Sequence, residues 1–237
     1  MIDALFATLT AKTFILLACA LSITGAGSFC VIEYFRRAAA RGAAFATLGT
    51  NKYGEPDIIP DPGLVKKIFW PFLILNVVAF LFLLFSGSIA VKLLAFAVFA
   101  LTDGLTIGLV LISTNERLGL RVMMLTALAT LISGFIGYFG NLDLAWMGSY
   151  LFFALLALIV VGFVRLFVKI TGWKRRLIAS LGILVFVGYL LYDFSALKAA
   201  KGTAALNNWA TAIDFSVNIY LDIINLFLEI LDALSDD

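Results

Sequence analysis

Seven long runs of apolar residues alternate along the chain with mostly short polar connections. The runs cover residues 13–30, 68–86, 90–112, 122–140, 145–168, 177–193 and 210–234. Each is long enough to cross the hydrocarbon layer as a helix, which takes roughly 20 residues. Apolar residues follow one another without alternation, which favours helices over the strands of a barrel. The pattern therefore predicts an all-α integral membrane protein, a seven-transmembrane-helix bundle that forms a single membrane domain over residues 1–237.

The composition supports this class and excludes several others. The chain has 237 residues, of which 63% are hydrophobic and 14% charged, whereas an average soluble domain is about half apolar and a quarter charged. The absence of histidine excludes His-ligated metal sites and Ser-His-Asp triads. The last apolar run lacks the lysine of a retinal Schiff base, and the motif pair of an aspartyl intramembrane protease is not reproduced. We expect no enzyme, no cofactor and, at a net charge of +2, no nucleic-acid partner.

One connection is long, at residues 31–67. It is predicted to be a basic, proline-containing loop in which Glu33 and Arg37 are spaced for an i,i+4 ion pair. Its arginines are expected to snorkel to the lipid surface. The loop also holds an acidic group that could either attract a cation at a pore mouth or form a solvated turn: Glu55, Asp57 and Asp61.

The distribution of basic residues predicts an orientation. Of the 17 Lys and Arg residues, thirteen fall on the side of the membrane that holds the C-terminus. Four fall on the other side: Lys12, Lys92, Lys198 and Lys201. The positive-inside rule then places the N-terminus outside and the C-terminus in the cytoplasm.

The last apolar run, residues 210–234, carries a narrow polar stripe. At the period of an α-helix, six polar residues lie within an arc of about 80°. They are Asp214, Asn218, Asp222, Asn225, Glu229 and Asp232. An acidic side chain at membrane depth costs roughly 2.5–3.5 kcal/mol, so the stripe should line a watery or protein interior. The alternative, an amphipathic helix on the membrane surface, usually carries Lys or Arg on its polar face, which this stripe lacks.

A second acid lies near the end of the sixth apolar run, in GYLLYDFSALK. If the sixth and seventh helices are antiparallel neighbours, Asp193 and Asp222 could approach each other. Two carboxylates in a low-dielectric site cannot both ionise easily, so such a pair is expected to share a proton. The alternative is an interfacial aspartate that caps the end of its helix.

The third run carries one base and one acid on nearly the same helical face, Lys92 and Asp103. A buried Asp103 would either add a third carboxylate or pair with a base from a neighbouring helix. The fourth run carries a stripe of small residues that suits close helix packing: Thr126, Thr130, Ser133 and Gly137.

Several of these segments together resemble the transmembrane Bax inhibitor motif family. The segments are DGLTIG in the third run, GYFGNLDLAWMGSYLFF across the fourth and fifth, LYDFSALK in the sixth and IYLDIINLFLEIL in the seventh. The last two are the most specific. The first 90 residues match only in having two helices.

The resemblance implies a seven-helix bundle with the seventh helix central and a pH-sensitive aspartate pair, which Asp193 and Asp222 match. Family members are described as calcium-leak channels whose flux depends on protonation of that pair, and bacterial relatives associate with a membrane protease. The family's basic cluster before the third helix is absent here, and in SGSIAVK only Lys92 remains as a possible basic partner.

Two functional hypotheses follow. The first is a pH-sensitive cation leak, for calcium, with ions passing near Asp193 and Asp222 and the pathway lined by further polar residues. These are Asp103, Asp214, Asn218, Asn225 and Glu229. The second is a regulatory or structural subunit of a larger membrane complex, such as one containing a membrane protease. The expected location is a bacterial inner membrane, with an organelle inner membrane as the alternative.

Overall fold

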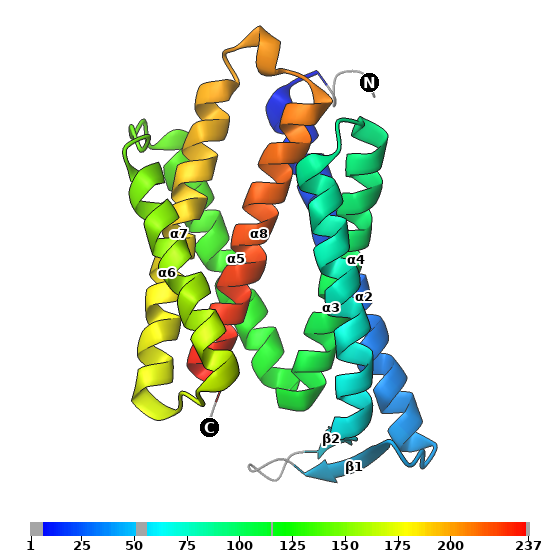
Figure 1. Ribbon diagram of the computed structural model, residues 1–237. Helices are drawn as coiled ribbons and strands as arrows, with labels where there is room; N and C mark the ends of the chain where they lie inside the picture. Colours follow the sequence, from blue (N-terminus) through cyan, green and yellow to red (C-terminus); the bar gives the residue numbers. More distant parts are fainter. Residues whose placement is uncertain (1–6, 51–55, 115, 236–237) are drawn as a thin grey trace. The chain divides into compact units, whose positions relative to one another are not determined.

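The computed structural model describes residues 7–50, 56–114 and 116–235, and most of them are helical (Figure 1). The described residues form seven α-helices, which confirms the predicted number, together with a 3-10 helix and two strands. The α-helices are α2 (Leu9–Ala40), α3 (Pro62–Phe85), α4 (Ile89–Thr114), α5 (Glu116–Phe139), α6 (Met147–Phe167), α7 (Gly172–Ala200) and α8 (Trp209–Leu234). The remaining elements are β1 (Ala46–Thr50), β2 (Pro56–Pro60) and η1 (Ala204–Leu206).

Six of these helices are long and apolar enough to cross a membrane. The helix outside this group, α8, has the length of a span but carries four acidic residues. In α6, only 6% of the most apolar window is buried by protein, whereas 61% is buried in α4. Because apolar side chains left uncovered by protein need a lipid environment, these helices belong to an integral membrane protein.

The chain divides into two compact units. The first comprises residues 1–14 and 120–237, and the second residues 15–119. Both boundaries fall inside continuous helices, one in α2 and one in α5. The single membrane domain stays a prediction.

Helix α7 packs against α8 in the first unit, and the turn containing η1 joins them. Helix α5 approaches α7 closely at Gly137, one residue of the stripe that was predicted to suit helix packing. A Cβ atom at Gly137 would lie 2.5 Å from the carbonyl oxygen of Leu191 and 3.0 Å from Cβ of Phe194. Only glycine allows the two helix backbones to come this close.

Glycine also sets the contact between α2 and α4 in the second unit. A Cβ atom at Gly104 would lie 2.3 Å from the carbonyl oxygen of Thr24. Two hydroxyl groups of α2 complete this contact: Thr24 donates a hydrogen bond to the carbonyl of Ala100 (3.0 Å) and Ser28 to that of Gly104 (2.8 Å). Hydroxyl-to-carbonyl bonds of this kind hold helices together in lipid.

The connection between the first two apolar runs differs from the predicted loop. The loop was expected at residues 31–67, but α2 continues to Ala40 and α3 already begins at Pro62. Alanine and arginine are strong helix formers and Glu33 pairs with Arg37, so the helix extends beyond the apolar run. Pro62 begins a helix instead of breaking one, because a first-turn residue needs no N–H partner.

An antiparallel β-hairpin occupies the middle of this connection, with Ala46 opposite Pro60 and Leu48 opposite Ile58. Helix α2 ends before it in a Schellman motif, in which Ala43 N–H donates to the carbonyl of Ala38 (3.0 Å) and Gly42 adopts φ 71°. Of the predicted acidic group, Glu55 and the side chain of Asp57 lie outside the described residues. The Asp61 carboxylate caps α3 by accepting hydrogen bonds from the backbone N–H groups of Gly63 and Leu64.

Candidate functional site

Two buried aspartates meet between α7 and α8. Asp193 lies in the second half of α7, where its residue is 6% exposed, and Asp222 lies at the middle of α8, where its residue is 7% exposed. The two helices are joined by a short turn and pack side by side, which brings residues 29 positions apart into contact. The side chains of Asp193 and Asp222 form a hydrogen bond with each other.

This hydrogen bond defines the chemistry of the pair. A carboxylate has no donor, so two carboxyl groups can bond only when one of them carries a proton. Among the described residues, neither aspartate forms an ion pair with a lysine or arginine, and the Asp222 Oδ2 atom is buried without a hydrogen-bond partner. Tyr189, one turn before Asp193, interacts electrostatically with both carboxyl groups. The pair is therefore a proton-binding element at the helix contact.

The other polar residues of the predicted stripe are distributed along α8 in different surroundings. Asp214 and Asn218 are exposed near the beginning of the helix. Asn225 is half-buried, and its amide donates to the carbonyl of Leu221 (2.8 Å) on the same helix. The Glu229 side chain lies against Gly182 of α7, where a Cβ atom would be 2.4 Å from the Glu229 Cδ atom. The structure therefore places Asp222 and Glu229 against α7 and leaves Asp214 and Asn218 exposed.

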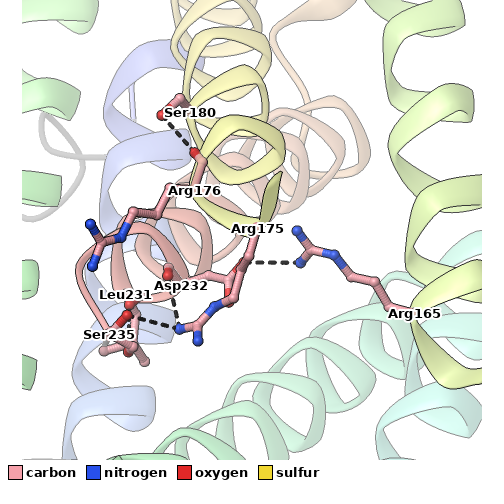
Figure 2. A network of polar contacts seen from close by, with 7 residues as sticks. All are labelled: Arg165, Arg175, Arg176, Ser180, Leu231, Asp232 and Ser235. Atoms are coloured by element: carbon pink, nitrogen blue, oxygen red, sulfur yellow. Dashed lines mark hydrogen bonds and ion pairs between the residues drawn. The ribbon is translucent and has the colours of Figure 1, made fainter. Parts of the chain in front are cut away.

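The last acid of the stripe, Asp232, belongs to a network of opposite charges (Figure 2). Arg165 at the end of α6 donates to Asp232 Oδ2 (2.9 Å), and Arg175 at the beginning of α7 donates to Asp232 Oδ1 (2.8 Å). Arg175 Nη2 also donates to the backbone carbonyls of Asp232 (3.0 Å) and Ser235 (3.1 Å), which lie at the end of α8. Arg165, Arg175 and Asp232 are called the arginine clamp below, because they join the ends of three helices.

Sequence reasoning missed the clamp, although it used both arginines to predict orientation. The signal that could have found it is the position of the three residues. Arg165 and Arg175 flank the short connection between α6 and α7, and Asp232 lies in the last turn of α8, which runs antiparallel to α7. Helix ends that meet at one level of an antiparallel bundle bring such charges together.

A second set of missed contacts holds the beginning of α8. Lys12, in the first turns of α2, is buried and donates to the backbone carbonyl and the side-chain Oδ1 of Asn207 (3.1 and 3.0 Å). Ser216 donates to the carbonyl of Thr13 (2.9 Å). These bonds fix the beginning of α8, as the arginine clamp fixes its end.

In the second unit, the predicted site residues of α4 have separate surroundings. Asp103 is half-buried and accepts a hydrogen bond from Asn76 Nδ2 on α3 (2.8 Å), and the same Asn76 amide contacts the Thr102 hydroxyl (3.0 Å). The sequence reasoning did not single out Asn76. Lys92 is half-buried near the beginning of α4. Among the described residues, no group of three or more Cys, Asp or Glu side chains is arranged to hold a metal ion.

The fold and the buried carboxyl pair define a helical membrane protein with two acidic side chains in contact between its last two helices. Comparison with known proteins gives the family. The family model described as "Inhibitor of apoptosis-promoting Bax1" matches residues 7–237, and the chain belongs to this Bax inhibitor family, which confirms the predicted resemblance.

Individual relatives come from viruses, bacteria and plants. The chain is 33% identical over 138 residues to a Golgi anti-apoptotic protein of vaccinia virus (strain Lister), which covers 57% of this chain and 54% of that protein. The match to an uncharacterised protein of Helicobacter pylori (strain J99) is 31% over 171 residues, 70% of each chain. The plant protein LIFEGUARD 1 of Arabidopsis thaliana is 24% identical over 185 residues, 76% of each. The chain thus spans about half the length of the viral relative.

Proposed function

We propose that this protein is a pH-sensitive leak channel for cations, calcium among them, gated by protonation of the Asp193–Asp222 pair. The observation that carries the proposal is the hydrogen bond between two buried carboxyl groups on neighbouring helices, with no basic partner among the described residues. Because the two carboxyl groups are buried and no positive charge among the described residues compensates them, whether they attract or repel each other depends on the shared proton.

The proton acts as a link between α7 and α8. With one shared proton the two carboxyls attract each other, and the helices stay in contact. Loss of that proton leaves two negative charges at hydrogen-bonding distance in a poorly solvated site, and their repulsion favours separation of α8 from α7. A passing cation offsets the same repulsion, and carboxylate oxygens suit a hard ion such as calcium. Flux should therefore rise as the pH rises and the shared proton leaves.

The remaining polar residues of α8 extend this pathway in the proposal. Asp214 and Asn218 would attract cations at one end of the helix, and Asn225 and Glu229 would contact them beyond the pair. Asp103 and Lys92 belong to the second unit, and we propose Asp103 as a further polar contact of the ion. The proposed location is a bacterial inner membrane, which the Helicobacter relative supports.

Purified full-length protein in liposomes tests the proposal. Calcium uptake is recorded at several pH values for the wild type and for the Asp193→Asn, Asp222→Asn double variant. We expect uptake that rises with pH in the wild type and uptake independent of pH in the double variant, since an amide does not titrate. The matched control is Asp143→Asn on the α5–α6 connection, where the amide oxygen can still accept the bond from Ala145 N–H (3.1 Å). An unchanged pH profile in the double variant would reject the mechanism.

The second candidate is a regulatory or structural subunit of a larger membrane complex, such as one with a membrane protease. The observation that favours it is the hairpin, which exposes two large apolar side chains, Leu48 (63% exposed) and Ile59 (53%). Leu48 lies opposite Ile58 and Ile59 opposite Thr47, so each face of the hairpin presents one apolar side chain that a partner could cover. Replacing both residues with serine should then release a partner that the wild-type protein retains after native purification, while pH-dependent uptake stays intact.

A further inference from the structure

An open groove lies in the second unit, at the end of α2. Its volume is about 580 Å³, and its walls come from the last three turns of α2 and from the segment that leads into β1. The groove begins beside the contact of α2 with Gly108 of α4, which packs against Ser28 and Val31, and none of its lining residues takes part in the aspartate pair. It therefore needs a separate explanation.

One wall of the groove is positively charged. Arg37 and Arg41 line it together with a single acid, Glu33. The Glu33 carboxylate pairs with Arg37 (2.6 Å) and with Arg36 (3.2 Å), which is not among the lining residues, so the groove wall itself carries two guanidinium groups and one carboxylate. Arg41 is exposed and forms no ion pair with any described residue. The groove keeps a net positive charge and suits a phosphate group, which guanidinium groups bind through paired N–H donors.

The other wall is aromatic. The Tyr34 ring stacks on Phe45 with the ring centres 6.0 Å apart and the planes at 14°, and both residues line the groove. Phe29, one helical turn deeper along α2, also lines it and is 63% exposed. A free phosphate ion would gain nothing from these rings. A phospholipid would, because its acyl chain continues away from the phosphate along an apolar surface.

The position in the chain fits the same ligand. The groove lies at the end of a helix long enough to span the membrane, where lipid headgroups are found. Two more exposed bases, Lys66 and Lys67, lie in the first turns of α3, which follows the hairpin. Basic residues next to a span attract anionic lipids of the same leaflet.

From the charge, the aromatic wall and this position we infer that the groove is a binding site for an anionic phospholipid. The phosphate lies between Arg37 and Arg41, and the first part of an acyl chain lies along Phe29 and Tyr34. The site is independent of the proposed leak.

The test measures binding of soluble short-chain lipids to the full-length protein in a neutral detergent by native mass spectrometry. The probes are dioctanoyl phosphatidylglycerol, dioctanoyl phosphatidylcholine and inorganic phosphate. We expect phosphatidylglycerol to bind more tightly than phosphatidylcholine. The Arg37→Gln, Arg41→Gln variant should bind phosphatidylglycerol about 25-fold more weakly, about fivefold for each charge, with little change for phosphatidylcholine.

Two further variants test whether the loss of binding is specific to the charges of the groove. Lys174→Gln, Arg176→Gln removes two exposed charges from the beginning of α7 and should leave binding unchanged. Arg41→Gln alone breaks no ion pair among the described residues, so it should fold normally and still weaken phosphatidylglycerol binding about fivefold. Three results would each overturn the inference. They are equal binding of both lipids to the wild type, equal weakening in the α7 control, and inorganic phosphate binding as tightly as the lipid.

Discussion

Helix α8 places acidic side chains in two opposite electrostatic settings. At its middle, Asp222 meets another acid, Asp193, and the contact holds only while a proton is shared. Near its end, Asp232 accepts hydrogen bonds from two arginines. The first setting joins two acids on neighbouring helices, and the second joins one acid to two bases. Because hydrogen bonds also hold the beginning of α8, both ends of the helix are fixed and only the contact at its middle depends on a shared proton.

The largest expected effect comes from removing the acid of the arginine clamp. In Asp232→Asn, both arginines lose a carboxylate, and the free energy of unfolding should fall by about 2 to 3 kcal/mol, since bonds to charged partners contribute most among hydrogen bonds and these are partly exposed. The measurement is denaturant unfolding in detergent. Asp143→Asn on an exposed connection serves as the control and should cost little. A loss no larger than in this control would mean that the clamp does not hold α8.

The next effect concerns the backbone around the aspartate pair. Gly137→Ala would put a Cβ atom 2.5 Å from the carbonyl oxygen of Leu191, two residues before Asp193. A backbone atom cannot step aside without moving α7, so we expect a loss of about 2 kcal/mol in unfolding free energy and a shifted pH profile of calcium uptake. Gly162→Ala is a matched control, because nothing lies within 4 Å of the added methyl group. Equal stability of the two variants would show that α5 does not constrain the pair.

A smaller effect should follow from neutralising one member of the pair. In Asp222→Asn, the amide N–H can donate to the Asp193 carboxylate, so the helix contact persists without a shared proton. We expect the unfolding free energy to change by less than about 1 kcal/mol at neutral pH. As the pH rises from about 4, where an aspartate of the unfolded chain ionises, the wild type should lose stability until the shared proton has left, and the variant should lose much less. The two proteins are compared by unfolding across a pH series, and parallel curves would contradict the shared proton.

The aspartate pair and the arginine clamp also differ in how far the sequence could predict them. The seven helices were predictable from the seven apolar runs. A segment that crosses a membrane forms its backbone hydrogen bonds within its own helix, and its side chains are apolar over a long stretch. The aspartate pair was predictable because two acids in apolar runs are rare and their helices are consecutive. The arginine clamp was missed because Arg165 and Arg175 lie at helix ends, where basic residues are common and carry no signal of a partner.

The sequence predicted the beginnings and ends of the helices less well than their number. Residues 31–67 were predicted to form one loop with prolines in its second half, yet Pro62 is the first residue of α3 and the prolines at 56 and 60 bound a strand of the hairpin. The hairpin and the groove beside it could not be predicted from the sequence. Each strand is only five residues long, which is too short for a clear alternation of apolar and polar residues. Lys12 was predicted only as a flanking charge, and its bonds to Asn207 join residues 195 positions apart, which no local pattern contains.

The smallest expected effect concerns Gly182, near the arginine clamp. It tests whether the helix contact there is more flexible than the contact near the aspartate pair. Gly182→Ala would place a Cβ atom 2.4 Å from Cδ of Glu229, nominally as close as the contact at Gly137. Here the opposing atoms belong to the end of a flexible side chain, which can rotate away, whereas at Gly137 they belong to a helix backbone. The same exchange of glycine for alanine gains similar helix propensity at both positions, so the difference between the variants isolates the contact. We expect Gly182→Ala to change the unfolding free energy by less than about 0.5 kcal/mol, against about 2 kcal/mol for Gly137→Ala. Similar losses in both variants would mean that Glu229 is held as firmly as a backbone, and the lower part of α8 would then be as rigid as the helix contact at the aspartate pair.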